Sequence, residues 1–321
     1  MSLRKKLALA SAAVVALGAI AGAVVTRKKT RLRLAYPAGE VTVTRDVTYV
    51  EGSTNPKHRL DVYAPKDARG APVVHFVHGG YWKQGDKSYY ALATGLYGSV
   101  GEALARRGIV TVVQSYRLTP EVAIDGILDD VLAAMRWTTA HAEEYGGDPK
   151  RLYTMGHSAG GHLVALIGTD EALARDVRGT IVLSGVWDVE HMSEDLSADF
   201  NAKVTHRTFG TDRAEWKKRS PIERLHPGMA PYFVVVGERD YEYMIPQARR
   251  AREELTALGM PPKYVELRDT DHAGVVLAFG ARNDPLSDEV AAFVSGPSTP
   301  GRASGGTPPD PPARPPSRAP P

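Results

Sequence analysis

A serine flanked by glycines stands where a buried strand is predicted to give way to a helix. The segment reads Gly156-His157-Ser158-Ala159-Gly160-Gly161. A serine on so tight a turn needs small neighbours, because the backbones approach closely and the serine conformation is strained. The turn lifts the Ser158 hydroxyl above the sheet edge, where the N-terminus of the following helix favours developing negative charge. This pattern predicts that Ser158 is a nucleophile.

A candidate acid and a candidate base lie at the same predicted edge of the sheet. Asp240 follows the predicted strand 232–236, and His272 follows the predicted strand 264–267. The order serine, acid, histidine is the one used by hydrolases whose serine lies on such a turn. His272 is therefore expected to accept the proton of Ser158 and return it to the leaving group. Asp240 is expected to hold the imidazole in the required tautomer.

The choice of acid has an alternative within the same loop. Glu238 follows the same strand, two residues before Asp240. Asp240 also has an alternative role, because an aspartate here can cap the helix that is predicted to begin near Pro246. We expect Asp240 to be the acid and keep Glu238 as the alternative.

A pair of glycines directly after the predicted strand 73–77 suggests a site for a negatively charged oxygen. The segment reads His78-Gly79-Gly80-Tyr81-Trp82. A tetrahedral oxyanion needs two or three amide N–H groups that converge on one point. Adjacent glycines let the main chain come close to the nucleophile without a side-chain clash. A glycine turn that merely ends the strand is the alternative, but the serine motif downstream favours an oxyanion loop.

The composition excludes several other kinds of site. The chain has no cysteine, which excludes disulfides, thiolate zinc sites, iron–sulfur clusters and cysteine nucleophiles. His75 and His78 lie three residues apart on a predicted strand and therefore face opposite sides, which argues against joint metal binding. We expect no metal and no cofactor. The net charge is only +3, too small to predict a nucleic-acid partner.

These residues require a framework of alternating strands and helices. Compact apolar runs predict buried strands at 73–77, 109–113, 152–155, 181–183, 232–236 and 264–267. Helices are predicted between them at 89–107, 124–145, 160–167, 246–258 and 285–293. The stretches 41–50 and 60–63 have no helix between them and suit an antiparallel edge. The pattern predicts an α/β fold with a mostly parallel central sheet and helices on both faces.

Three further segments depart from this pattern. Residues 7–25 carry no charge and have basic flanks, and at about 1.5 Å per residue they span roughly 28 Å, close to the hydrocarbon thickness of a bilayer. Residues 1–33 are therefore expected to form a single-pass N-terminal membrane anchor, with a cleaved signal peptide and secretion as the alternative. Within the hydrolase domain, expected at 34–295, the charged stretch 187–231 is predicted to be a lid-like insertion. Residues 296–321 hold ten of the 23 prolines and are expected to be a disordered tail.

The set of motifs resembles the α/β-hydrolase superfamily, and within it the carboxylesterase and kynurenine formamidase-like branch. The resemblance spans about residues 40–295. Besides the two glycine motifs it is carried by Ser115-Tyr116-Arg117-Leu118, Gly146-Gly147-Asp148-Pro149-Lys150-Arg151, Ser220-Pro221 and Asp271-His272-Ala273-Gly274. In that branch the first glycine motif supplies oxyanion amides from its second glycine and the next residue. The resemblance thus implies Gly80 and Tyr81 as donors, with Ala159 as the third.

Together these observations predict a serine hydrolase that cleaves small carboxylic esters through an acyl-enzyme, with aryl formamides as a second substrate class. The expected partners are a small ester or amide substrate and a membrane, and the oligomeric state is not predicted. The alternatives are a peptidase of the prolyl-oligopeptidase type and a non-catalytic hydrolase-fold binding module. Both are less favoured, because no segment resembles the propeller domain of such peptidases and every triad and oxyanion residue is kept.

Overall fold

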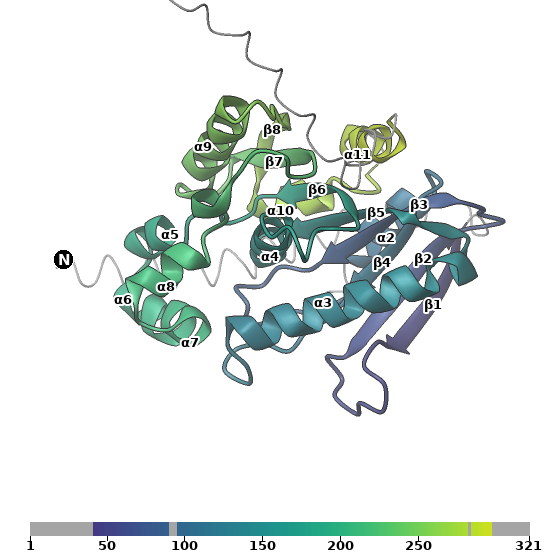
Figure 1. Cartoon of the computed structure of the whole chain (residues 1–321), viewed down its shortest axis with the longest axis horizontal. Coiled ribbons are helices and arrows are strands. Elements are labelled where there is room, and N and C mark those ends of the chain that lie inside the picture. Colours follow the sequence, from purple (N-terminus) through teal and green to yellow (C-terminus); the bar gives the residue numbers. More distant parts are fainter. Residues whose placement is uncertain (1–40, 90–94, 282–283, 297–321) are drawn as a thin grey trace, which may run out of the picture.

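The core of the protein is a sheet of eight strands. The computed structural model describes residues 41–89, 95–281 and 284–296. The strand order is β1-β2-β4-β3-β5-β6-β7-β8 (Figure 1). The strands are β1 (Val41–Thr48), β2 (Arg59–Pro65), β3 (Ala71–Val77), β4 (Val110–Gln114), β5 (Gly147–His157), β6 (Val177–Leu183), β7 (Tyr232–Arg239) and β8 (Lys263–Asp271). β2 pairs antiparallel with both β1 and β4, whereas every neighbouring pair from β4 to β8 is parallel, so the predicted fold class is confirmed.

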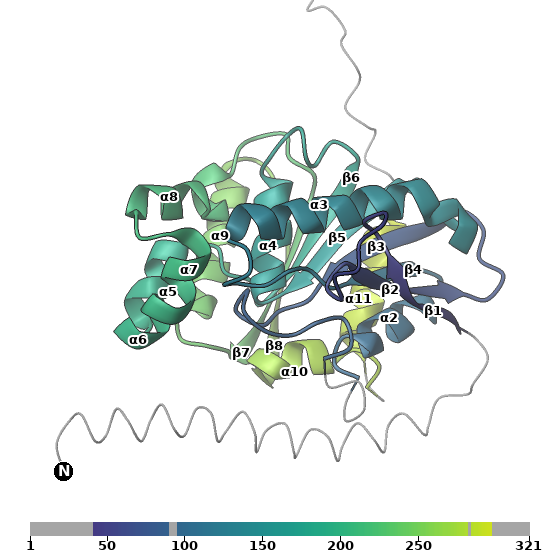
Figure 2. The ribbon, with the colours of Figure 1, turned by 90° about the horizontal axis from the view of Figure 1, so that it is seen from below.

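Helices cover both faces of this sheet, because its strands are apolar on both sides. In β7, for example, Phe233 and Val235 enter one hydrophobic core while Val234 and Val236 enter the other. Figure 2 shows α3 and α4 on one side of the sheet and α2 and α10 on the other. The described helices that pack on the sheet are α2 (Gly98–Ala105), α3 (Ile124–His141), α4 (Ala159–Gly168), α9 (Met244–Ala257), α10 (His272–Leu277) and α11 (Pro285–Ser295).

Most predicted helices are present, with differences at their ends. The helix predicted at 89–107 is shorter, since α2 begins only at Gly98 and is preceded by Gly95 with a φ of +59°. The helix predicted at 124–145 ends as α3 at His141 and continues as the 3₁₀ turn η1 (Ala142–Tyr145). α10 was not predicted, because its six residues are too few to show a helical period.

The segment 187–231 forms a group of short helices between β6 and β7. They are α5 (Val189–Asp195), α6 (Ala198–Phe200), the π-helical turn η2 (Asn201–Thr205), α7 (His206–Phe209), α8 (Arg213–Lys218) and η3 (Pro221–Arg224). We call this group the cap. It lies at the end of the molecule opposite to β1 (Figure 1, Figure 2).

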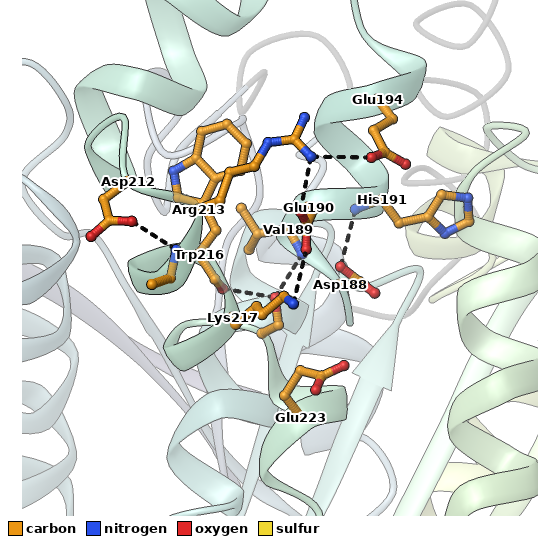
Figure 3. A network of polar contacts seen from close by, with 12 residues as sticks. Asp188, Val189, Glu190, His191, Glu194, Asp212, Arg213, Trp216, Lys217 and Glu223 are labelled. Atoms are coloured by element: carbon orange, nitrogen blue, oxygen red, sulfur yellow. Dashed lines mark hydrogen bonds and ion pairs between the residues drawn. The ribbon is translucent and has the colours of Figure 1, made fainter.

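Polar contacts hold the cap helices to one another and to the sheet domain. Glu190 on α5 accepts a hydrogen bond from Arg213 on α8 at 2.9 Å, and Lys217 lies 3.9 Å from the same carboxylate (Figure 3). At the base of the cap, Gln247 of α9 accepts hydrogen bonds from the backbone amides of Trp187 and Asp188 at 2.8 and 2.9 Å. The cap is thereby fixed at its first residues to a helix of the sheet domain.

The predicted single-pass membrane localisation is contradicted. Throughout the described residues, no helix combines the length and the apolar character that crossing a bilayer requires. The longest of these helices, α3, carries several charged side chains among its 18 residues and buries only one face. The predicted anchor at 1–33 lies outside the described residues, and so does the predicted tail at 296–321 apart from Gly296.

Candidate functional site

The three side chains predicted to do chemistry lie within hydrogen-bond distance of one another. His272 Nε2 is 2.9 Å from Ser158 Oγ, and His272 Nδ1 is 2.8 Å from Asp240 Oδ1. Ser158 stands between β5 and α4, Asp240 follows β7, and His272 opens α10 after β8. All three residues therefore lie at the carboxyl edge of the parallel strands β5, β7 and β8. The predicted nucleophile, base and acid are thus joined by one continuous set of hydrogen bonds.

The serine sits on a strained turn that neighbouring glycines make feasible. Ser158 has a φ of +57° and a ψ of −120°, a conformation that costs a non-glycine residue about 1–3 kcal/mol. A Cβ added to Gly160 would lie 2.1 Å from the carbonyl oxygen of Val77, so α4 can approach β3 only without a side chain there. The turn projects Ser158 at the first turn of α4, where helix geometry leaves the amide N–H of Ala159 without an intrahelical acceptor.

Asp240 is held by more donors than His272 alone. Its Oδ1 also accepts from the Tyr241 amide at 2.8 Å, and its Oδ2 accepts from the Ser184 hydroxyl at 2.5 Å. Burial by itself would raise the pKa of Asp240, but the hydrogen bonds from His272 and Ser184 outweigh it and keep the pKa below its usual value. The carboxylate therefore stays ionised next to the imidazole.

Glu238, the alternative acid, lies outside this arrangement. Its side chain is exposed, and its Oε2 accepts a hydrogen bond from the Asp269 amide at 2.8 Å. The structure therefore brings Asp240, and not Glu238, to the histidine.

The segment from His78 to Trp82 lies directly beside the nucleophile. A Cβ built on Gly79 would come within 2.9 Å of the Ser158 Cβ. The Gly79 amide itself donates to the Tyr97 hydroxyl at 3.0 Å. Tyr81 and Trp82 both have left-handed backbone, with φ of +55° and +57°, so the chain turns sharply here.

The loop is fixed from below by aromatic contacts. The Tyr116 hydroxyl donates to the His78 carbonyl at 3.0 Å, and the two rings stack with centroids 4.2 Å apart. Among the hydrogen bonds of the described residues, none uses the backbone amides of Gly80 or Tyr81 as donors. These two amides, with that of Ala159, are therefore free to donate hydrogen bonds to a negatively charged oxygen.

Two contacts of this site could not be seen in the sequence. Ser184, which is 1% exposed and has a φ of +46°, directly follows β6 and donates to Asp240. Its only signal is that it directly follows a buried strand at the same sheet edge. His157 donates from Nε2 to the carbonyl oxygen of His272 at 3.0 Å. Its position next to Ser158 was the available signal.

Aromatic side chains line the approach to the histidine. The Tyr241 ring lies 4.5 Å from the His272 ring and 6.4 Å from the Tyr81 ring. Phe200 of the cap meets Tyr81 edge-on at 5.1 Å. The site is therefore bordered by aromatic rings from the His78–Trp82 segment, the β7–α9 loop and the cap.

No metal-binding arrangement is found in the part of the chain that the structure describes. There, no three His, Asp or Glu side chains are grouped so that they could hold a metal ion. His75 and His78 are bonded separately: the His75 ring lies between Thr138 and Gln114, and His78 Nδ1 meets the Gly79 carbonyl.

Comparison with known proteins gives a family, relatives and solved structures. The BD-FAE family model matches residues 60–255. The esterase LipC of Mycobacterium tuberculosis is 31% identical, over 75% of this chain and 62% of its own length. A probable isoprenylcysteine alpha-carbonyl methylesterase of Arabidopsis thaliana is 26% identical, over 79% of this chain and 56% of its own length. The chain thus spans roughly three fifths of these curated relatives.

Solved structures share the fold over most of the chain. Esterase B of Lactobacillus rhamnosis superposes with a TM-score of 0.68 at 21% identity, covering 88% of this chain and 93% of that one. An esterase of Pyrobaculum calidifontis gives a TM-score of 0.66 at 19% identity, covering 85% and 89%. At these identities the likeness is one of fold.

Proposed function

The chain belongs to the BD-FAE family, an esterase family of the α/β-hydrolase superfamily, and on this premise we propose that it hydrolyses carboxylic esters through an acyl-enzyme on Ser158. The observation that carries the proposal is the continuous line of hydrogen bonds from Ser158 through His272 to Asp240. Ser158, at one end of this line, lies beside the loop 78–82, whose amides at Gly80 and Tyr81 have no acceptor among the described residues.

The first half of the reaction forms the acyl-enzyme. The Ser158 hydroxyl donates to His272 Nε2, which requires the proton of the neutral imidazole to be on Nδ1, where Asp240 accepts it. As Ser158 Oγ attacks the ester carbonyl, its proton passes to Nε2 and the carbonyl oxygen becomes an oxyanion. The amides of Gly80, Tyr81 and Ala159 would bind that oxygen. The imidazolium then gives its proton to the alkoxy group as the carbon–oxygen bond breaks, and the alcohol leaves.

The second half repeats the same steps with water. His272 accepts a proton from water, whose oxygen attacks the acyl carbonyl in the same oxyanion site. Collapse of this intermediate releases the carboxylic acid and returns the proton to Ser158 Oγ. The charge of Asp240, kept ionised by Ser184 and His272, stabilises the imidazolium in both halves.

Hydrolysis of p-nitrophenyl esters by the full chain tests this proposal. We would measure kcat/KM from acetate to decanoate, with the methyl ester of a prenylated cysteine and N-formylkynurenine as further substrates. Ester turnover that Ser158→Ala reduces at least 10³-fold supports the proposal, because the nucleophile is then lost. Labelling of Ser158 by a fluorophosphonate probe, read by mass spectrometry, is expected alongside.

The outcomes separate the alternatives. Turnover that is unchanged in Ser158→Ala refutes the mechanism. Folded protein that neither turns over esters nor reacts with the probe refutes the proposed activity and favours the binding-module alternative. Formamide cleavage that exceeds ester cleavage would place the substrate among amides and overturn the ester assignment.

A further inference from the structure

His157 lies between Ser158 and His272, and it forms no hydrogen bond with Ser158 Oγ or with His272 Nε2. It ends β5, immediately before Ser158, and its Nε2 is 3.0 Å from the carbonyl oxygen of His272. The two imidazole rings are 4.7 Å apart and tilted by 37°. This contact joins residues 115 positions apart in the sequence. It is a direct link between the nucleophile strand and the backbone that carries the base.

The hydrogen bond defines the protonation of His157. A carbonyl oxygen only accepts, so Nε2 carries the proton, and the buried Nδ1 has no partner among the described residues. Burial, followed by the effect of the neighbouring His272, lowers the pKa of His157 to about 3, so the ring stays neutral. The titratable groups that face it are His272 on α10, Asp240 after β7 and, with its ring 6.2 Å away, Tyr97.

Neutrality is needed at this position. A positive charge 4.7 Å from His272 would oppose the imidazolium that each half of the reaction requires. A neutral donor instead fixes the His272 backbone without competing for its proton. The same carbonyl sits on the residue whose two ring nitrogens must meet Ser158 and Asp240 at 2.9 and 2.8 Å.

Resting on the proposed function, we propose that His157 is a positioning residue, whose neutral Nε2–H group holds the backbone of His272 so that its imidazole reaches Ser158 and Asp240 together. Its hydrogen bond goes to the His272 backbone, and it has none to Ser158 Oγ or to the ring nitrogens of His272. Its effect is on alignment, and a displacement of about 1 Å at a reacting group can cost on the order of 10²-fold in rate.

The test compares two amide side chains with different reach. In His157→Gln the amide nitrogen is as many bonds from Cβ as Nε2 is, so the donor to the His272 carbonyl is kept. In His157→Asn the nitrogen is one bond shorter and falls at the place of Nδ1, so that donor is lost. We expect kcat of the glutamine variant within about threefold of wild type, and kcat of the asparagine variant about 10- to 100-fold lower at an unchanged KM.

A pH profile distinguishes alignment from simple packing. The acid limb of kcat/KM reports protonation of the base in the free enzyme. In His157→Asn a displaced imidazole loses part of its bond to Asp240, so the limb moves to lower pH, whereas His157→Gln keeps the wild-type limb. His75→Gln is the matched control: it removes another fully buried neutral histidine, bonded to Thr138 and Gln114, and should leave kcat within about twofold.

Each outcome decides the proposal, provided that circular dichroism shows folded protein. A fast His157→Asn variant overturns it. Equally slow glutamine and asparagine variants also overturn it, because the Nε2 donor is then not the cause. Ser158→Ala is measured beside them: if it keeps activity, the proposed function itself has failed, whereas an inactive Ser158→Ala with a fast His157→Asn rejects only the positioning role.

Discussion

Replacing Asp240 by asparagine is the most informative single change, because the structure indicates how the amide would sit. Two donors, the Tyr241 amide and His272 Nδ1–H, meet Oδ1, so the amide oxygen belongs there. The amide nitrogen then faces the Ser184 hydroxyl, which can rotate and accept, and the change gives up only the long 3.4 Å hydrogen bond that Oδ2 accepts from the Gly237 amide. The imidazole tautomer is therefore kept, and the change removes charge with little loss of geometry.

The expected size of the effect follows from that lost charge. Oδ1 and Nδ1 are 2.8 Å apart, and the charges of both groups are delocalised, so their centres are separated by about 4 Å. At an effective dielectric constant near 20, two unit charges at that distance interact by about 4 kcal/mol. Since about 1.4 kcal/mol corresponds to a factor of ten, we expect kcat/KM of Asp240→Asn to fall about 10³-fold.

The assay is p-nitrophenyl butyrate hydrolysis at pH 8, with thermal unfolding as the check on folding. Glu238→Gln is the matched control, because Glu238 is exposed and its glutamine can still accept from the Asp269 amide. We expect it within twofold of wild type. A loss below tenfold in Asp240→Asn refutes the electrostatic argument. A large loss in Glu238→Gln together with a small one in Asp240→Asn would show that the acid is Glu238.

Three further predictions concern the support of the site. Ser184→Ala removes a hydrogen bond to a carboxylate worth about 1.5–3 kcal/mol, so kcat should fall about 10- to 100-fold in the same assay, and an unchanged kcat would show that Asp240 needs no second donor. Gln247→Leu leaves the amides of Trp187 and Asp188 without their acceptor, so urea denaturation should show a loss of about 3 kcal/mol, and a loss below 1 kcal/mol contradicts the clamp. Urea denaturation at pH 7, 6 and 5 should show stability falling below pH 6.5 by up to about 1.4 kcal/mol per pH unit for each histidine that stays neutral when folded but takes up a proton when unfolded. Burial lowers the pKa of four histidines from 6.5 to about 3 or 4, namely His75, His78, His157 and His162. Their contribution to the free energy of unfolding is therefore complete above pH 6.5 and is lost as the pH falls towards 4. A stability that does not change between pH 7 and pH 5 contradicts this prediction.

Much of the fold could be predicted because its signals are local. Strands buried on both faces are continuous apolar runs, and α3 shows its buried face as a helical period of Ile124, Ile127, Leu128 and Val131. The ends of elements were predicted less well. The helix predicted from residue 89 begins at Gly98, since only the path of the chain through Gly95 shows where the helical conformation starts.

The residues of the site also differ in how far their roles could be predicted from local sequence. The glycines around Ser158 are required by close backbone approach, which a sequence motif records directly. The acid was less certain, because Glu238 and Asp240 are two residues apart and a regular strand would point both to the same side. The shift in the pairing of β7 with β8 after Gly237 ends that regularity, and it leaves Asp240 buried beside His272 and Glu238 exposed.

By itself, the sequence therefore predicted Ser158 as the nucleophile, and it determined the order of the three side chains along the chain and the parallel sheet that brings their loops to one edge. The tertiary structure decided which carboxylate meets the histidine, that Ser184 supports it and that His157 reaches the His272 backbone. The physical reason is range. A tight turn or an apolar strand constrains residues a few positions apart, whereas the bonds from His272 to Ser158 and Asp240 span 114 and 32 positions and exist only once the sheet has formed.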